Sequence, residues 1–290
     1  MLSTFLLDPF KEDSVRNSLV AVLALAFSAA PVGVFLMLRR MSLVGDAMAH
    51  AILPGVAVGF LVAGANIFVM TFGGLVAGII VALVAGLISR STALQEDASL
   101  AVFLLISLAL GVMIVTLKGM DVERLMEFLF GETAALMNSG KLLVIVTNAT
   151  VSLVVLALIY RPLVLDCVDP GFLRSVSRAG GIAHLAFLAL LAINLVSAFH
   201  AFGTLLGVSI IIIPAAVARF WTRDISIMML LASLCGALSG WIGLFISFHA
   251  NMPSGPVVTL VAGSLYLGSV LFGRIGGLVW RAFPGRHLEA

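Results

Sequence analysis

The sequence predicts an all-α integral membrane protein, a polytopic bundle of about nine transmembrane helices (eight to nine) in a single domain. Hydrophobic residues make up 62% of the 290 residues and charged residues only 10%, whereas soluble domains carry about 25% charged residues. The mean hydropathy is +1.22. The apolar residues also gather into segments of the length that crosses a hydrocarbon layer of about 30 Å. These observations exclude an ordinary soluble globule.

Nine segments are long enough, or nearly so, to span a membrane, and Gly and Pro inside them are compatible with membrane helices. The seventh and ninth are short, so eight spans remain an alternative. The predicted spans are Leu19–Leu38, Ala47–Ala63, Ile67–Ile88, Ala98–Leu117, Leu142–Tyr160, Ile182–Phe199, Thr204–Ala218, Ser226–Phe248 and Pro256–Phe272.

The basic residues predict the orientation, because cytoplasmic loops are enriched in Lys and Arg. If the loop at Arg39 and Arg40 faces the cytoplasm, nine alternating spans place eleven of the sixteen basic residues on that side. We therefore predict a multi-pass protein with the N-terminus outside and the C-terminus inside. The first seventeen residues are polar and contain five charges, so we expect no cleavable signal peptide.

Two predicted loops are long enough to hold structure. In the outer loop, Lys118–Gly140, apolar residues follow helical spacing over Val122–Phe130, which favours an interfacial helix or a docking site for an outside partner. In the inner loop, Arg161–Gly181, Asp169 before Pro170 predicts a helix start and Gly180–Gly181 a helix stop. This short cytoplasmic helix is either a connector or a lever for a cytosolic partner.

Several kinds of catalytic and nucleotide-binding motif are missing. The chain has no GxxxxGK[ST] stretch, no HExxH and no GxSxG, so nothing predicts a nucleotide site, a metalloprotease or a serine hydrolase. Cys167 and Cys235 lack CxxC spacing and indicate no disulfide framework. If this chain moves a solute uphill, the energy comes from an ion gradient or from another subunit.

Asp46 and His50 are the first candidate functional residues, because they are polar residues within an apolar span. A centred Asp costs about 3 kcal/mol on an insertion scale, and such residues often mark the path of an ion. Four residues apart, the two side chains share one helix face. A carboxylate and an imidazole form half of a transition-metal site. The alternative is a structural pair that bonds internally.

Two further places supply candidate ligands. Glu96 and Asp97 lie about two turns past Arg90, at a depth similar to Asp46 if that stretch is helical; capping at the membrane edge is the alternative. His249 lies in the turn SFHANMPSGP. It is a candidate third ligand or a ligand near the outer side, and the alternative is a solvated residue with no role in binding. His200 is a weaker candidate of the same kind, and Pro214 permits a kink in the seventh span.

Six motifs together resemble a known family. The longest is RMSLVGDAMAHAILPGVA at Arg40–Ala57, which is similar to R-M-S-x-x-G-D-A-x-x-H-A-x-x-P-G-V-A. The others are LQED at Leu94–Asp97, LFG at Leu129–Gly131, DPGF at Asp169–Phe172, GTLL with IPAA at Gly203–Leu206 and Ile213–Ala216, and SFHANMPSG at Ser247–Gly255. Over nearly its whole length the chain resembles the permease subunits of bacterial zinc and manganese ABC importers.

Two positions depart from the family pattern. Asn251 stands where the family often has Asp, which removes a carboxylate near the outer turn. Leu173 and Ser177 stand where small Ala and Gly are usual in the cytoplasmic helix. A close approach of that helix to a partner is less favoured as a result, although Phe172 can still anchor it.

The resemblance implies a homodimeric permease in a bacterial cytoplasmic membrane, with the pathway between two copies. It implies alternating access driven by separate cytosolic ATP-binding subunits and delivery by an extracytoplasmic metal-binding protein, with no permanently bound cofactor, no enzyme activity and no nucleic acid partner. By motif position, the transported Zn²⁺ or Mn²⁺ would meet Asp46, His50, Glu96 and His249. The ATPase would couple through Asp169, Pro170, Phe172, Arg174, Arg178 and Gly180.

Composition alone leaves a second reading open. A proton-coupled secondary metal transporter would use Asp46 and Glu96 as proton carriers, would work without an ATPase, and often shows paired halves, which this sequence lacks. An intramembrane enzyme would need a nucleophile or a catalytic metal set on facing helices, and no such set is visible in the sequence.

Overall fold

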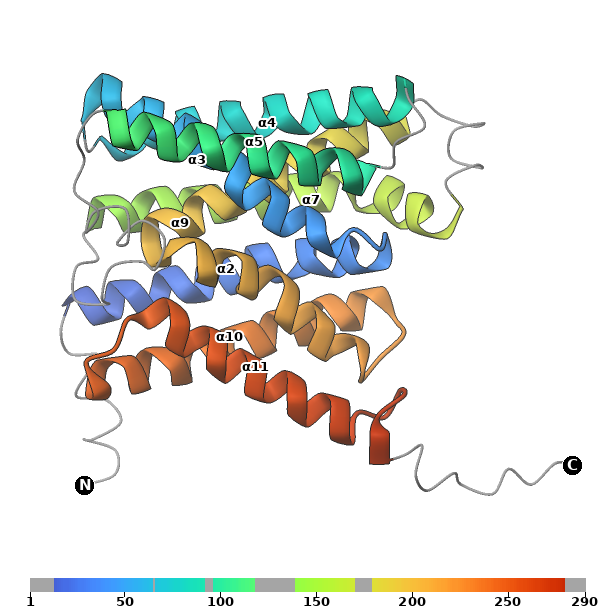
Figure 1. Cartoon of the computed structure of the whole chain (residues 1–290). Coiled ribbons are helices and arrows are strands. Elements are labelled where there is room, and N and C mark those ends of the chain that lie inside the picture. Colours follow the sequence, from blue (N-terminus) through green and yellow to red (C-terminus); the bar gives the residue numbers. More distant parts are fainter. Residues whose placement is uncertain (1–12, 65, 92–95, 118–138, 170–178, 280–290) are drawn as a thin grey trace, which may run out of the picture.

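The computed structural model describes residues 13–64, 66–91, 96–117, 139–169 and 179–279, and every regular element in them is an α-helix (Figure 1). This confirms the predicted all-α class. The helices are α2 (Asp13–Leu38), α3 (Ser42–Ala63), α4 (Ile67–Ser91), α5 (Glu96–Leu117), α7 (Ser139–Val168), α9 (Ala179–Arg219), α10 (Ile225–Ala250) and α11 (Ser254–Phe272).

The described helices cross the bundle nine times. Helix α9 makes two of these passes, because its direction reverses at Gly203, where φ is 81° and ψ is 176° (Figure 1). Eight passes in this part of the chain are long and apolar enough to span a membrane. The remaining pass is α5, whose described apolar stretch covers Leu100–Ile114. The multi-span bundle expected from hydropathy is therefore present.

Because helix directions alternate, the ends of α2, α7, α9 and α11 lie at one end of the bundle (Figure 1), and most of the described arginines lie on or beside these helix ends. We call this the arginine-rich end. It carries the turn after α2, the last turns of α7 and the connections that follow α9 and α11. The described arginines there are Arg39, Arg40, Arg161, Arg219, Arg223 and Arg274. Arg16 and Lys141 lie at the opposite end, so the asymmetry used to predict orientation is a feature of the folded chain.

Two expectations about element boundaries need correction. Residues 161–168, assigned to the inner loop, are helical, because α7 continues to Val168 through Pro162. Gly180 and Gly181 lie in the first turn of α9 and not at the end of a preceding helix. The break between the sixth and seventh passes falls at Gly203, inside the predicted gap between Phe199 and Thr204, and only glycine readily adopts these angles. The predicted helices at 122–130 and 170–178 lie outside the described residues.

Helix α2 lies at the centre of the bundle and packs against α7, α9 and α10. Small residues make these crossings close. A methyl group at Gly33 would overlap the Ile211 carbonyl of α9, and one at Gly240 of α10 would overlap Val22. Close approach of this kind is how membrane helices associate, because lipid offers no hydrophobic driving force between them.

A buried polar network ties α2, α7 and α9 together at mid-bundle. Ser28 donates to Asn194 Oδ1 over 2.8 Å, and Asn194 Nδ2 donates to Ser152 Oγ over 2.6 Å and to the Leu190 carbonyl over 2.8 Å. All three side chains are buried. Because the amide is satisfied at both ends, the network stabilises one register of the three helices at little desolvation cost.

Helix α3 belongs to a second group. It packs mainly against α4 and α5, also against α9, and only slightly against α2. Gly55 of α3 faces Gly73 of α4 so closely that a Cβ on either would overlap the carbonyl of the other. Gly59 meets the backbone of Val69 and Met70 in the same way. This glycine seam holds one face of α3 and leaves another face for polar side chains.

The glycine seam can be tested by adding one methyl group. Gly55→Ala should lower the thermal midpoint of the detergent-purified chain by several degrees, because the new Cβ overlaps backbone and overpacking costs about 1–3 kcal/mol. Gly263→Ala is the control, since a Cβ there meets nothing within 4 Å. Equal midpoints for both variants would contradict the packing described here.

Candidate metal site

The turn between α2 and α3 sets where the polar face of α3 begins. Arg40 adopts the left-handed conformation with φ 59°, and the Met41 N–H bonds the Leu36 carbonyl over 2.9 Å while the Arg40 N–H bonds that of Met37 over 3.1 Å. This pattern is a Schellman cap formed without glycine. Since α3 starts directly after it at Ser42, Asp46 lies one turn into α3 from the arginine-rich end.

Asp46 and His50 lie on one face of α3, as the spacing predicts. Nε2 of His50 is 3.8 Å from Oδ1 of Asp46, too long for a hydrogen bond. The Asp46 side chain is 54% exposed and that of His50 is 24% exposed. Nδ1 of His50 is buried and has no hydrogen-bond partner among the described residues. The two side chains are therefore close enough for an ion pair but form no hydrogen bond with each other.

Both side chains open into a pocket of about 350 Å³ between α3 and the second pass of α9. Gly45 faces Ile212 across this gap. The pocket is lined by Asp46, Ala49, His50, Thr204, Leu205, Val208, Ser209, Ile212 and Ile213. Most of the wall is apolar, so a cation in the pocket would interact chiefly with the carboxylate and the imidazole.

Two residues with hydroxyl side chains, Thr204 and Ser209, lie on the α9 wall. The Ser209 hydroxyl lies 2.8 Å from the Thr259 hydroxyl of α11 and 3.1 Å from the Leu206 carbonyl, so it is already bonded. Thr204 follows the break at Gly203 directly and lines the pocket. The sequence reasoning missed this wall, although Gly203 and Thr204 belong to the GTLL motif that it noted.

Asp46 and His50 supply one oxygen and one nitrogen ligand. Across a tetrahedral zinc ion such donors would lie about 3.4 Å apart, so a small side-chain rotation would close the observed gap. No cluster of three or more His, Cys, Asp or Glu is present among the described residues. A bound ion would therefore need further ligands from water, from undescribed side chains or from another chain.

Glu96 is the first residue of α5, which packs against α3. Gly111 of α5 faces Leu53 and Pro54 of α3. A depth of Glu96 similar to that of Asp46 stays a prediction. The Glu96 side chain itself lies outside what the structure describes.

His249 lies at the opposite end of the bundle. It is in the last turn of α10, about 24 Å further along the bundle axis than His50. Its Nδ1 is 3.0 Å from the Phe245 carbonyl, which only accepts, so Nδ1 carries the proton and Nε2 the lone pair. Asn251 ends α10 in the left-handed conformation, with φ 50°, which Asn and Asp both tolerate. The structure does not bring His249 to the Asp46 pair.

The predicted coupling residues are only partly described. Asp169 is exposed at the end of α7, and Gly180 is half-buried in the first turn of α9. Pro170, Phe172, Arg174 and Arg178 lie outside the described residues, as does the side chain of His200. The two described residues bracket the segment that the sequence analysis assigned to ATPase coupling.

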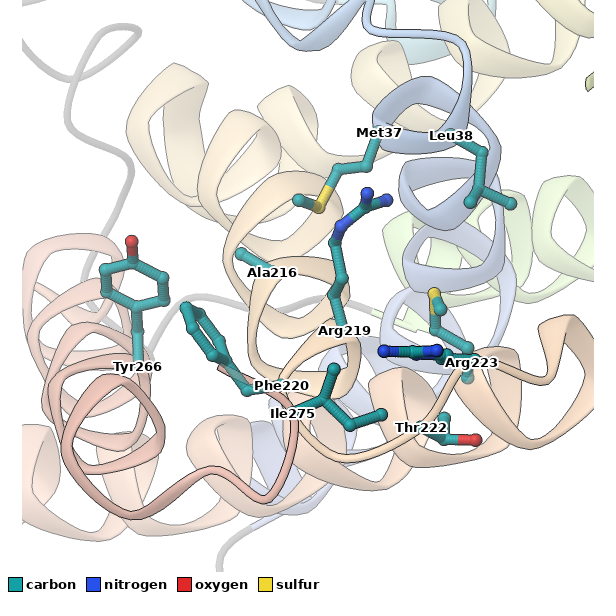
Figure 2. A pocket seen from close by; sticks show the side chains of 10 residues that line it. Met37, Leu38, Ala216, Arg219, Phe220, Thr222, Arg223, Tyr266 and Ile275 are labelled. Atoms are coloured by element: carbon teal, nitrogen blue, oxygen red, sulfur yellow. The ribbon is translucent and has the colours of Figure 1, made fainter. Parts of the chain in front are cut away.

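A larger pocket of about 590 Å³ at the arginine-rich end is a poor cation site (Figure 2). Arg219 and Arg223 both lie along it, with Phe220, Tyr266 and apolar side chains around them (Figure 2). No carboxylate, imidazole or thiol lines it. Two guanidinium groups would repel a divalent ion, which leaves the smaller pocket as the better candidate.

Comparison with known proteins identifies the family. A model of the ABC 3 transport family matches residues 11–273. The chain belongs to the ABC 3 transport family. It is a multi-pass membrane subunit of the permease type and not an enzyme, which agrees with the resemblance seen in its motifs.

The relatives cover nearly the whole chain. The manganese import system permease protein ScaB of Streptococcus parasanguinis is 34% identical over 253 residues, which are 87% of this chain and 88% of ScaB. The zinc transport system membrane protein TroC of Treponema pallidum is 28% identical, over 97% and 96% of the two chains. The solved structure of PsaBC from Streptococcus pneumoniae in complex with Fab contains a chain with TM-score 0.85 and 25% identity, covering 97% of this chain and 100% of that one.

The break at Gly203 yields a prediction about the pocket wall. Gly203→Ala should cost about 1–3 kcal/mol, because these backbone angles are essentially confined to glycine, and relaxation of the strain should displace Thr204 and the pocket wall. A lower thermal midpoint together with weaker binding of Mn²⁺ is the expected result. Gly181→Ala, in the same helix with nothing within 4 Å of the added Cβ, should change neither. If Gly203→Ala keeps the wild-type thermal midpoint and Mn²⁺ affinity, glycine is not required at this position.

Proposed function

We propose that this chain is the membrane subunit of an ABC importer that carries Mn²⁺ or Zn²⁺ into the cytoplasm by alternating access. The observation that carries the proposal is the pair of Asp46 and His50, which face a pocket inside an apolar bundle. Nδ1 of His50 has no hydrogen-bond partner in the described part of the chain. Manganese and zinc relatives in the same family support the choice of cargo.

The donor set fits a first-row transition metal that must be released again. A carboxylate and a neutral imidazole suit Zn²⁺ or Mn²⁺, and no thiolate lines the pocket to hold the ion more tightly. Two protein ligands replace only part of the hydration shell, so binding is weak enough for passage. Protonation of His50 would compete with the metal.

A second copy of the chain would complete the pathway. More than half of the Asp46 side chain is uncovered in the single chain, and exposure of a carboxylate to hydrocarbon costs several kcal/mol. A homodimer with its pathway along this face would cover Asp46 with protein and water. It would also supply additional ligands from the partner.

The arginine-rich end is the cytoplasmic end in this proposal, because basic residues favour that side. The N-terminus is then outside and the C-terminus inside the cytoplasmic membrane. Cytosolic ATP-binding subunits would contact the segment between α7 and α9, including Asp169, Phe172 and Gly180. An extracytoplasmic metal-binding protein would deliver the ion near His249.

Removal of either donor tests the site. Asp46→Ala and His50→Ala should each lower metal uptake by at least about tenfold in proteoliposomes that contain the full transporter, because each removes one ligand from an already sparse set. Metal affinity of the purified complex should fall with uptake. Asp13→Asn is the control, since Asp13 forms only an exposed ion pair with Arg16, of 2.8 Å. Normal uptake by both alanine variants would refute the site.

Charge reversal at Arg174 or Arg178 tests the coupling segment. Each change should lower metal-stimulated ATP hydrolysis several-fold while metal binding stays at the wild-type level, because a contact with the ATPase is altered and the pocket is not. Arg161→Glu, an exposed change on α7, serves as the control. Unchanged stimulation in the two variants would argue that the segment is only a connector.

A proton-coupled secondary transporter is the remaining alternative. It would use Asp46 and Glu96 as proton carriers, and it would transport metal in liposomes that contain this chain alone. Family membership favours the ABC importer. Uptake that requires added ATP and an ATP-binding subunit would separate the two.

A further inference from the structure

A buried charged cluster at the arginine-rich end joins three helices. The Arg39 guanidinium pairs with the Asp166 carboxylate near the end of α7, and its Nη1 lies 3.0 Å from Nδ1 of His184 in α9. The guanidinium also lies 5.0 Å from the centroid of the Phe187 ring. The side chain of Arg39 is only 6% exposed and that of Asp166 is 21% exposed. This is a shielded contact, unlike an exposed surface ion pair.

The two partners of Arg39 flank the proposed coupling segment. Asp166 lies four residues before residue 170, and His184 lies six residues after residue 178. Both sides of the segment are therefore held to one guanidinium. Because a guanidinium only donates, the His184 imidazole accepts at Nδ1. Any displacement of α7 relative to α9 at this end must stretch or break one of the two contacts.

Arg39 also sits directly before the metal-site helix. The Schellman turn at Arg40 follows, α3 begins at Ser42, and Asp46 lies one turn further on. Helix α3 packs only slightly against α2 along its length. The short turn after Arg39 is therefore a direct link between the α2, α7 and α9 core and the helix that carries Asp46 and His50.

We infer that Arg39 is a positioning residue that transmits movement of the coupling segment to the metal pocket. When the ends of α7 and α9 move, the Asp166 and His184 contacts pull on the α2–α3 turn and shift Asp46 and His50 relative to the α9 wall. One donor of the cluster, Nε of Arg39, is buried without a partner among the described residues, so the cluster is not saturated and can rearrange. This inference rests on the proposed function.

A purely structural role for Arg39 is the competing explanation, and the Asn194 network provides the control for it. Asn194 bonds the same three helices at mid-bundle, away from the turn. Asn194→Ala should therefore destabilise the same core without touching the link to α3. Arg161→Gln controls for loss of one positive charge on α7 at the same end, because Arg161 is exposed and forms no ion pair with the described residues.

The experiment compares Arg39→Gln, Arg39→Lys, Asp166→Asn and the two controls in the full reconstituted transporter. Thermal midpoint, Mn²⁺ and Zn²⁺ affinity, and metal-stimulated ATP hydrolysis are measured for each. Arg39→Gln and Asp166→Asn should bind metal within about twofold of wild type but lose at least about fivefold of the stimulation. Arg39→Lys should be intermediate, because an ammonium lacks the fork that bonds two partners at once. Asn194→Ala should lower the midpoint and keep the stimulation of the folded protein.

Two outcomes would overturn the inference. The first is full stimulation in Arg39→Gln. The second is a loss of stimulation in Arg39→Gln that is no larger than the loss in Asn194→Ala at a comparable drop in thermal midpoint. A wild-type transporter that binds neither metal and is stimulated by neither would instead remove the proposed function, and with it the basis for this role of Arg39. If metal stimulates ATP hydrolysis by the wild-type transporter and by the Arg39 variants equally, only the positioning role of Arg39 is removed.

Discussion

A carboxylate in a membrane-spanning helix must be covered by something other than lipid, and this requirement governs the rest of the structure. Asp46 is 54% exposed in the single chain, so its helix cannot lie against hydrocarbon on that face. The other faces of α3 are apolar and pack against neighbouring helices. Gly55 and Gly59 bring the helix into backbone contact with α4, which anchors it without using the polar face.

The helices around the candidate site form two groups that are held together in different ways. Helices α2, α7 and α9 form a core in which polar groups are satisfied internally, through Asn194 at mid-bundle and Arg39 at the arginine-rich end. Helices α3, α4 and α5 form the second group, joined at close approaches such as that of Gly55 with Gly73. The pocket of Asp46 and His50 lies at their boundary, against α9.

The sequence predicts which site residues share one helix face, because that depends only on their spacing along the chain. It does not predict how deep residues on different helices lie relative to each other, because that depends on how the helices pack. The shared face of Asp46 and His50 follows from a spacing of four residues in a helix. The depth of Glu96 relative to Asp46 does not, because it depends on how α5 packs against α3, for example where Gly111 faces Leu53. His249 shows the same limit, since nothing in its local sequence says that about 24 Å of bundle separates it from His50.

The amino-acid sequence by itself determined the helical class, the alternation of nine passes, the sidedness of the arginines and the Asp46–His50 pair. These properties depend on hydropathy, charge and helical period, which are all local. The tertiary structure decided that the second pass of α9 forms the pocket wall beside Asp46 and His50, and that Arg39 meets Asp166 and His184. These contacts join residues 127 and 145 positions apart, and no local pattern encodes which distant helices a central helix will meet.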